Sequence, residues 1–199
     1  MTIRVEPATS DRWADVRAAF GPVASRADSC WCQRFRRHDG PSNEVALHHE
    51  VERAVVPIGV IAYLDGGPVG WSRVVPRASL PGITENAALR RLLSDDPHAC
   101  WVAWVNDRRE ARGQGVGAAL LLRAIAHARE HGASVLDGHP VDTALSTSRP
   151  AASALFTGTV SMFVEAGFHE IGRTCRTRPV MRVELDAADP TPRERPGAN

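Results

Sequence analysis

The chain of 199 residues contains no lysine, because all 24 residues counted as Lys or Arg are arginines. This absence excludes a Schiff-base lysine and the Walker phosphate loop, which ends in Gly-Lys-Ser or Gly-Lys-Thr. A surplus of charge of one sign is also lacking, since 24 basic and 23 acidic residues leave a formal net charge of +1. We therefore expect neither nucleic acid nor a membrane as a partner.

Cysteines and long apolar runs are scarce. The chain has four cysteines, at Cys30, Cys32, Cys100 and Cys175, too few and too irregular for a disulfide framework. No stretch approaches the roughly 18 apolar residues that a membrane span requires, and no apolar signal segment follows the first residues. These absences predict a soluble cytoplasmic protein.

The composition is that of a globular protein. Hydrophobic residues make up 43% of the chain and charged residues 24%, which is enough apolar material for one substantial core. We predict a single domain over residues 1–185. The remaining residues, 186–199, are polar and rich in proline and are predicted to be a disordered tail.

The spacing of apolar residues predicts the first half of the fold. Alternation predicts a strand at Thr2–Pro7, and helical spacing predicts one helix from Ser10 to Gly21 and another after Ser42. A hairpin and a long polar connection follow, with strands at Ile58–Leu64 and Pro68–Val75 and a mobile connection at Arg77–His98.

The second half is centred on an apolar strand. Cys100–Val105 is almost wholly apolar, which is typical of a central strand covered on both faces. An amphipathic helix is predicted at Ala118–Glu130. The other predicted elements are a strand at Ala133–Leu136, an irregular loop at Asp137–Ser153, a helix at Gly158–Ala166 and a hairpin of Phe168–Arg173 and Pro179–Leu185.

A glycine-rich loop, Arg112-Gly113-Gln114-Gly115-Val116-Gly117, joins the central strand to this helix. Glycines allow backbone N–H groups to approach an anion closely, and the helix dipole favours negative charge there, so a phosphate or pyrophosphate is the natural ligand. A tight turn that binds nothing is the alternative.

A dinucleotide fingerprint also fits this loop. Gly113, Gly115 and Ala118 have the Gly-x-Gly-x-x-Gly/Ala spacing, and Asp137 lies about 20 residues further on. Position argues against a nicotinamide cofactor, because only about 80 residues follow and that fold needs several further βα units.

The combination of motifs resembles the GCN5-related N-acetyltransferase family. The resemblance is carried by Arg112-x-x-Gly115-x-Gly117 after an apolar strand, by Gly167-Phe168 after the last helix, and by the order of elements from Thr2 to Leu185. It implies an α/β (α+β) fold in which helices flank one mixed, mostly antiparallel twisted sheet with a splayed central strand pair.

The resemblance also implies a chemistry. A neutral primary amine, on a small molecule or a protein, would attack the thioester of acetyl-CoA directly in a ternary complex. The resemblance also implies a homodimer. Backbone N–H groups would hold the pyrophosphate, Arg112 would lie at the loop's rim, and the end of the central strand would pair with the pantetheine arm. The residues so assigned are Val105, Asn106, Arg112, Gly113, Gln114, Gly115, Val116, Gly117 and Ala118.

Two features depart from the family pattern. The connection from Val105 to Arg112 is about two residues longer than usual, which leaves the register at Val105 and Asn106 open. Many members carry a Tyr in the last helix that protonates the departing thiolate, and Phe163 stands at the matching position near the cofactor. Ser161 or a water could donate that proton instead. A catalytically silent acyl-CoA-binding module is therefore the alternative to an active enzyme.

A proton acceptor is useful because most amines are protonated at pH 7. His139 and Asp142 follow the strand that ends at Leu136, beside the expected cofactor site, and are the candidates. The alternative is that Asp142 caps a turn and His139 is a solvated loop residue.

The Cys30–Arg37 segment has the most unusual local composition in the chain. In this fold it flanks the acceptor site, so Trp31 and Phe35 could line a substrate pocket, and an arginine, with Arg34 as one candidate, could select an anionic acceptor. The alternative is two aromatic anchors in the core with solvated arginines. Cys30 and Cys32 lack the second pair and the spacing of a zinc site, so no metal is expected.

Overall fold

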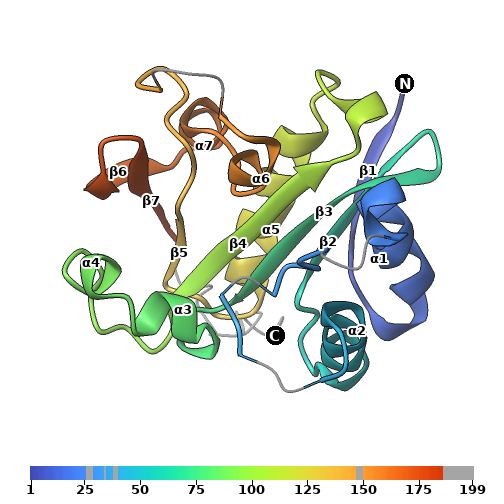
Figure 1. Ribbon diagram of the computed structural model, residues 1–199, viewed down its shortest axis with the longest axis horizontal. Helices are drawn as coiled ribbons and strands as arrows, with labels where there is room; N and C mark the ends of the chain where they lie inside the picture. Colours follow the sequence, from blue (N-terminus) through green and yellow to red (C-terminus); the bar gives the residue numbers. More distant parts are fainter. Residues whose placement is uncertain (26–28, 34, 38–39, 147–149, 186–199) are drawn as a thin grey trace, which may run out of the picture.

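The computed structural model describes residues 1–25, 29–33, 35–37, 40–146 and 150–185, so the predicted tail lies outside the described residues. One sheet of seven strands, ordered β1-β2-β3-β4-β5-β7-β6, organises the domain (Figure 1). Neighbouring strands are antiparallel except for the pair β4 and β5, which is parallel. The strands are β1 Ile3–Pro7, β2 Gly59–Leu64, β3 Gly67–Pro76, β4 Cys100–Asp107, β5 Val135–Gly138, β6 His169–Cys175 and β7 Arg178–Glu184.

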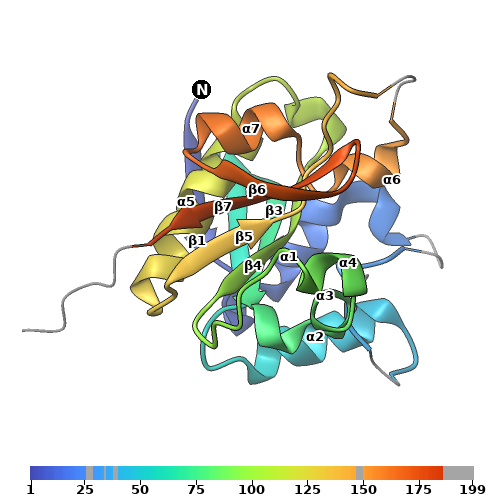
Figure 2. The same ribbon diagram turned by 90° about the vertical axis from the view of Figure 1, so that its left-hand side faces the viewer.

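Helices cover both faces of this sheet (Figures 1 and 2). Val60 and Ala62 of β2 pack in one apolar cluster with α5, whereas Ile61 and Tyr63 pack in another with α1 and α2. Successive strand residues point to opposite faces, so α5 lies on one side of the sheet and α1 and α2 on the other. The helices are α1 Trp13–Phe20, α2 Asn43–Arg53, α3 Pro81–Thr84, α4 Ala87–Arg90, α5 Val116–Glu130, α6 Ala152–Leu155 and α7 Val160–Glu165.

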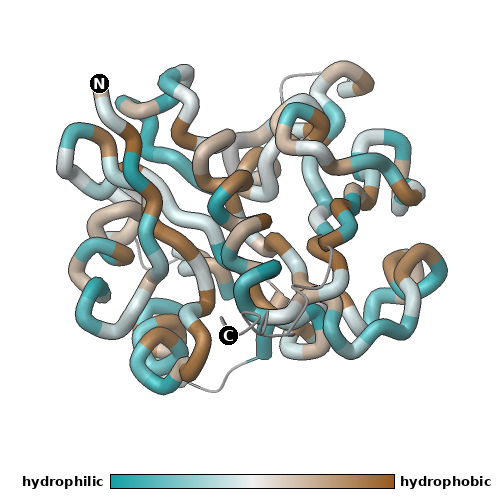
Figure 3. Tube along the Cα trace, turned by 180° about the vertical axis from the view of Figure 1, so that it is seen from behind, coloured by the Kyte–Doolittle hydropathy of each residue, from teal (hydrophilic) through white to brown (hydrophobic). Residues whose placement is uncertain are grey.

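The strand β4 is buried on both faces, as its apolar sequence predicted. Val102 and Val105 contribute to the cluster under α5, and Trp104 contributes to the cluster under α1 and α2. Figure 3 shows apolar (brown) and polar (teal) residues in short alternating stretches along the chain, as expected where elements bury one face. No helix among the described residues is long and apolar enough to cross a membrane.

The connection between β3 and β4 contains two short helices, one of them at the helical pattern that begins at Ala87, and its predicted mobility stays a prediction. The sequence indicated a mobile segment because it is polar and contains prolines. In the structure α3 and α4 form there, and Leu80, Ile83 and Leu89 are buried in a third apolar cluster with Trp101 of β4. A few well-spaced apolar residues thus anchor the segment to the end of the sheet.

Candidate active site

The parallel strands β4 and β5 separate partway along their length. They pair only from Cys100 to Val102 on β4. Immediately beyond, the register of β3 and β4 shifts, because Arg73 faces Trp104 and Val74 faces Val102, so Ala103 has no residue opposite it. Such a bulge bends the strand that carries it. The splayed pair expected from the family resemblance is therefore present, and it begins at the bulge.

A short segment, Phe156–Val160, lies between the separated strands; we call it the bridging segment. The backbone N–H of Val105 donates to the carbonyl of Phe156 at 2.8 Å, and the N–H of Val141 donates to the carbonyl of Gly158 at 3.0 Å. Parallel bridges join Val105 to Thr157 and Val141 to Thr159. The N–H of Val105, which the sequence analysis assigned to the pantetheine arm, is thus already bonded to the protein's own backbone.

Side chains hold the bridging segment in place. The ring of Phe156 stacks on Trp104 with centroids 4.5 Å apart. Arg178 on β7 donates from Nη1 to Oγ1 of Thr157 at 2.8 Å. The bridging segment is therefore anchored to β4 on one side and to β7 on the other.

A cavity of about 210 Å³ opens beside the bridging segment. It brings together four of the residues predicted to bind the cofactor, namely Val105, Asn106, Arg112 and Gly117. The other lining residues are Asp107, Leu155, Phe156, Gly158, Thr159 and Met162. All of these except Asp107, which ends β4, come from the bridging segment and its neighbours, whose position only the tertiary structure determines.

The glycine loop places the N-terminus of α5 beside this cavity, and no side chain caps that helix end. Gly113 and Gly115 have φ values of 75° and 83°, a left-handed conformation that favours glycine. Gly115 is the N-cap of α5 and supplies no side-chain hydrogen bond. The first bond of the helix runs from the N–H of Ala119 to the carbonyl of Gly115 at 3.0 Å. The N–H groups of Val116, Gly117 and Ala118 precede that bond and have no acceptor within the helix.

The surface of the loop has room for a ligand. A Cβ atom added to Gly113 would meet nothing within 4 Å, and one added to Gly115 would meet only Ile3 Cδ1 at 3.9 Å. Nε2 of Gln114 donates to the carbonyl of Glu110 at 2.9 Å, so this side chain is bound to the turn that precedes the loop. Because α5 starts at Val116, two residues before the predicted start at Ala118, the loop is shorter than the sequence indicated.

An acidic residue that sequence reasoning missed lies in the cavity wall. Asp107 ends β4, and its Oδ1 lies 3.4 Å from Nε of Arg112. Burial raises the pKa of Asp107, and the adjacent guanidinium of Arg112 opposes that shift. Asp107 therefore orients Arg112 at the mouth of the loop.

Phe163 is part of the core of the domain. Its side chain is fully buried and packs edge-on against Phe168 with centroids 4.7 Å apart. The ring fills the space above two glycines, since a Cβ on Gly138 or Gly158 would lie 2.3 or 2.9 Å from it. Phe163 does not line the cavity described above.

Ser161 lies close to the cavity. It is exposed, and its Oγ lies 3.0 Å from Oγ1 of Thr159, which lines the cavity and caps α7. A hydroxyl pair therefore stands at the start of α7.

The two candidate bases are bound to the terminal hairpin. Nε2 of His139 lies 2.8 Å from Oγ1 of Thr174, and the buried Asp142 accepts from Nη1 of Arg173 at 2.9 Å. Neither residue lines the cavity described above. Asp137, the acidic residue of the dinucleotide fingerprint, is fully buried between Arg77 and Arg182, each at 2.7 Å, and is not available to a ribose.

The segment around Trp31 covers the face of the sheet that carries α1 and α2. Trp31 is buried and packs against Phe20 and Trp13, so it is an aromatic anchor of the core. Phe35 is half-buried, and its carbonyl accepts from the N–H of Gly82. Arg34 lies outside the described residues.

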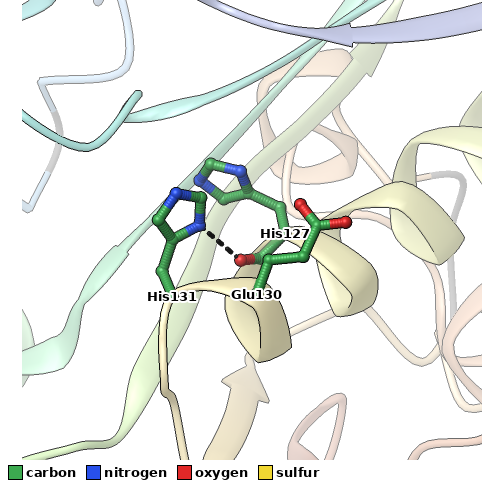
Figure 4. Close-up of side chains that lie close together, drawn as sticks. All are labelled: His127, Glu130 and His131. Carbon is green, nitrogen blue, oxygen red and sulfur yellow. Dashed lines mark hydrogen bonds between the residues drawn. The ribbon is translucent and has the colours of Figure 1, made fainter. Parts of the chain in front are cut away.

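One group of three possible metal ligands occurs among the described residues, at the far end of α5 from the glycine loop (Figure 4). Each member already has a protein contact. Nε2 of His127 meets the carbonyl of Pro57 at 2.8 Å, Nδ1 of His131 meets the carbonyl of His127 at 2.7 Å, and Glu130 pairs with Arg123 at 3.0 Å. The cluster therefore fixes the C-terminal end of α5, since its groups already bond to the protein.

The sequence model of the acetyltransferase (GNAT) family matches residues 24–144, more than half of the chain. The chain therefore belongs to the GNAT family. The mixed, mostly antiparallel sheet with its parallel β4–β5 pair is the fold of that family. No curated protein sequence matches the chain.

Solved structures share the fold at low sequence identity. The GNAT domain of Streptomyces lividans PAT is 18% identical with a TM-score of 0.59, covering 93% of this chain and 92% of that one. Ribosomal-protein-alanine N-acetyltransferase from Brucella melitensis is 19% identical with a TM-score of 0.54, covering 92% and 99%. The yncA protein of Salmonella typhimurium, solved with its cofactor acetyl-CoA, is 16% identical with a TM-score of 0.55, covering 94% and 95%.

Proposed function

We propose that this protein transfers the acetyl group of acetyl-CoA to a primary amine of a small molecule or a protein. The observation that carries the proposal is the cavity of about 210 Å³ that joins the uncapped start of α5 to the splayed end of β4. The structure of yncA with acetyl-CoA supports the choice of acyl donor. The dinucleotide alternative is poorly supported, because its acidic residue Asp137 is fixed in a buried ion-pair network.

The residues present fit an acyl-CoA. The N–H groups of Val116, Gly117 and Ala118 would receive the pyrophosphate, since they lie at the positive end of the α5 dipole and have no acceptor within the helix. Arg112, paired with Asp107, lies at the rim. The backbone of Val105 and Asn106 would offer an edge to the pantetheine arm once the bond from Val105 to Phe156 is released.

The acyl donor supplies an activated thioester, at which the amine forms a C–N bond while the C–S bond breaks. The protein must accept one proton from the amine and return one to the departing thiolate. We assign the first task to His139, with Asp142 holding the surrounding loop through Arg173. We assign the second to Ser161, beside Thr159 at the cavity. A thiol with a pKa near 8.5 leaves readily, so this help is modest.

Calorimetric titration with acetyl-CoA, CoA and NAD is the first test, because it requires no knowledge of the acceptor. Binding of acetyl-CoA and CoA but not of NAD supports the assignment of the glycine loop. A panel of amines is then screened for amine-dependent release of free thiol. Binding without turnover would identify a catalytically silent acyl-CoA-binding module, and NAD binding alone would overturn the proposal.

A further inference from the structure

A buried arginine on the face of the sheet opposite α5 has hydrogen-bond donors that the described residues do not satisfy. Arg73 of β3 is 0% exposed, and its Nη2 donates to both carboxylate oxygens of Glu50 at 2.8 Å. Its Nε and Nη1 atoms have no hydrogen-bond partner among the residues that the structure describes. Trp104 faces Arg73 across the strand pair, and its indole Nε1 is likewise buried without a partner in the described chain.

The charges around Arg73 do not balance. Glu50 also pairs with Nε of Arg36 at 2.7 Å, so two guanidinium groups share one carboxylate. Burial raises the pKa of Cys32, which keeps the adjacent thiol neutral. Among the described residues of this cluster, Gln33 Oε1 is the one buried acceptor without a partner, and the other unpartnered atoms are donors of Arg73 and Trp104. This cluster, with a buried Arg73 and a partly exposed Arg36 on one carboxylate and with surplus buried donors, is complementary to an anion that accepts hydrogen bonds.

This cluster lies next to the proposed reaction cavity. Val105, the residue after Trp104, lines the cavity, and so does Phe156, whose ring stacks on Trp104 at 4.5 Å. Trp104 is thus one side chain beyond the cavity, on the face away from α5, and Arg73 is its neighbour on the adjacent strand. An acceptor approaching from this face would present its amine to the cavity and its other end to Arg73.

The segment that covers the cluster carries backbone strain. Trp31 and Cys32 are buried, and their φ values of 42° and 60° lie in the left-handed region, although neither is glycine. Cys32 accepts at Sγ from Nε1 of Trp71 at 2.9 Å, which locks the segment onto β3. Strain of this kind is stored where the surrounding structure enforces it, commonly at ligand sites, and it lowers the cost of moving the segment.

We infer that the acceptor of this enzyme is an amine that also carries a carboxylate, with Arg73 and Trp104 as the groups that bind the carboxylate. This inference rests on the proposed acetyl transfer and names its substrate class. The carboxylate would accept from Nε and Nη1 of Arg73, and the indole N–H would add a further donor. Because Arg73 is fully buried, binding would require the segment at Trp31 and Cys32 to shift and the hydrogen bond from Trp71 to Cys32 to break.

The test compares each of the twenty standard amino acids with its carboxamide, which keeps the amine and removes the anion. Thiol release is measured at saturating acetyl-CoA. We expect kcat/KM to be about 10- to 100-fold higher for accepted acids than for their amides, as a charge-assisted bond predicts. Arg73→Gln should abolish this preference, and Trp104→Phe, which removes only the indole N–H donor from an aromatic wall, should reduce it. Arg53→Gln, an exposed change on α2, is the matched control.

The outcomes separate this inference from the proposed function. Equal turnover of acids and amides would overturn the inference and leave acetyl transfer intact. Acetyl-CoA binding without turnover of any amino acid would also overturn it. Failure to bind acetyl-CoA would instead refute the proposed function. If Arg73→Gln does not fold, Trp104→Phe decides, because an unchanged acid-to-amide ratio in that variant contradicts the assigned site.

Discussion

The backbone N–H of Val105 donates a 2.8 Å hydrogen bond to the carbonyl oxygen of Phe156. This bond closes the gap between β4 and β5 at the place where an acyl-CoA arm is expected to add to the edge of β4. The arm and the bridging segment thus compete for one donor. Binding at Val105 requires that the bridging segment give up this bond.

Weakening the bridging segment should therefore tighten acetyl-CoA binding. Thr157→Val keeps the shape of the side chain but removes the acceptor of the 2.8 Å bond from Arg178. We expect the Kd for acetyl-CoA to fall by about threefold, a fraction of what a bond to a charged group contributes. Calorimetry measures it, with Leu145→Ala, an exposed change in the same connection, as control. Weaker binding in Thr157→Val would mean that the bridging segment forms part of the site as it stands.

The glycine loop can be tested with a pair of substitutions that carry the same backbone strain. Gly115 and Gly132 stand at the two ends of α5, with φ values of 83° and 77°, and a Cβ at either position has space. Each change to Glu costs about 1 kcal/mol in conformation. Only Gly115→Glu places a carboxylate where the pyrophosphate is expected, so it should abolish acetyl-CoA binding while Gly132→Glu leaves the Kd unchanged. Equal affinities in the two variants would refute the loop assignment.

Phe163→Tyr tests the missing proton donor. The family resemblance predicts that a tyrosine here raises turnover if Phe163 is the only obstacle to acid catalysis, because many members carry a tyrosine at the matching position. The structure predicts otherwise, since the ring is fully buried against Phe168 and the space above Gly138 and Gly158. A buried hydroxyl without a partner costs about 1 to 3 kcal/mol. We expect a lower Tm and no gain in kcat; a higher kcat at unchanged Tm would show that the hydroxyl reaches the thiolate.

Local sequence patterns predicted most of the fold. The β-rich composition of Ile58–Leu64, the uninterrupted apolar run at Cys100–Val105 and the helical spacing after the glycine loop each indicate a buried element. All three elements form within a few residues of their predicted ends. The glycine loop was predictable for the same reason, because its residue types dictate its backbone.

The parts of the site that sequence reasoning missed depend on contacts between distant segments. Nothing in residues 156–160 indicates that they insert beside Val105, since that pairing depends on a bulge at Ala103 and on Arg178 from another hairpin. The unsatisfied donors of Arg73 could not be predicted from the sequence either, because an arginine in a strand is usually exposed. Such features become visible only when burial is known.

Buried His127 predicts an acid-sensitive fold. Burial lowers the pKa of His127 from 6.5 to about 4, and the neighbouring His131 adds to the shift. The unfolded chain takes up this proton below pH 6.5 and the folded protein only near pH 4, so the stabilisation is complete above pH 6.5 and is lost as the pH falls through that window. The loss amounts to about 3 kcal/mol in the free energy of unfolding. Urea unfolding at pH 7 and pH 4.5 measures it in the wild type, in His127→Gln, and in His49→Gln as an exposed control. His127→Gln should lose distinctly less stability between the two pH values than the other two proteins; the same loss in all three would show that His127 does not set the acid limit.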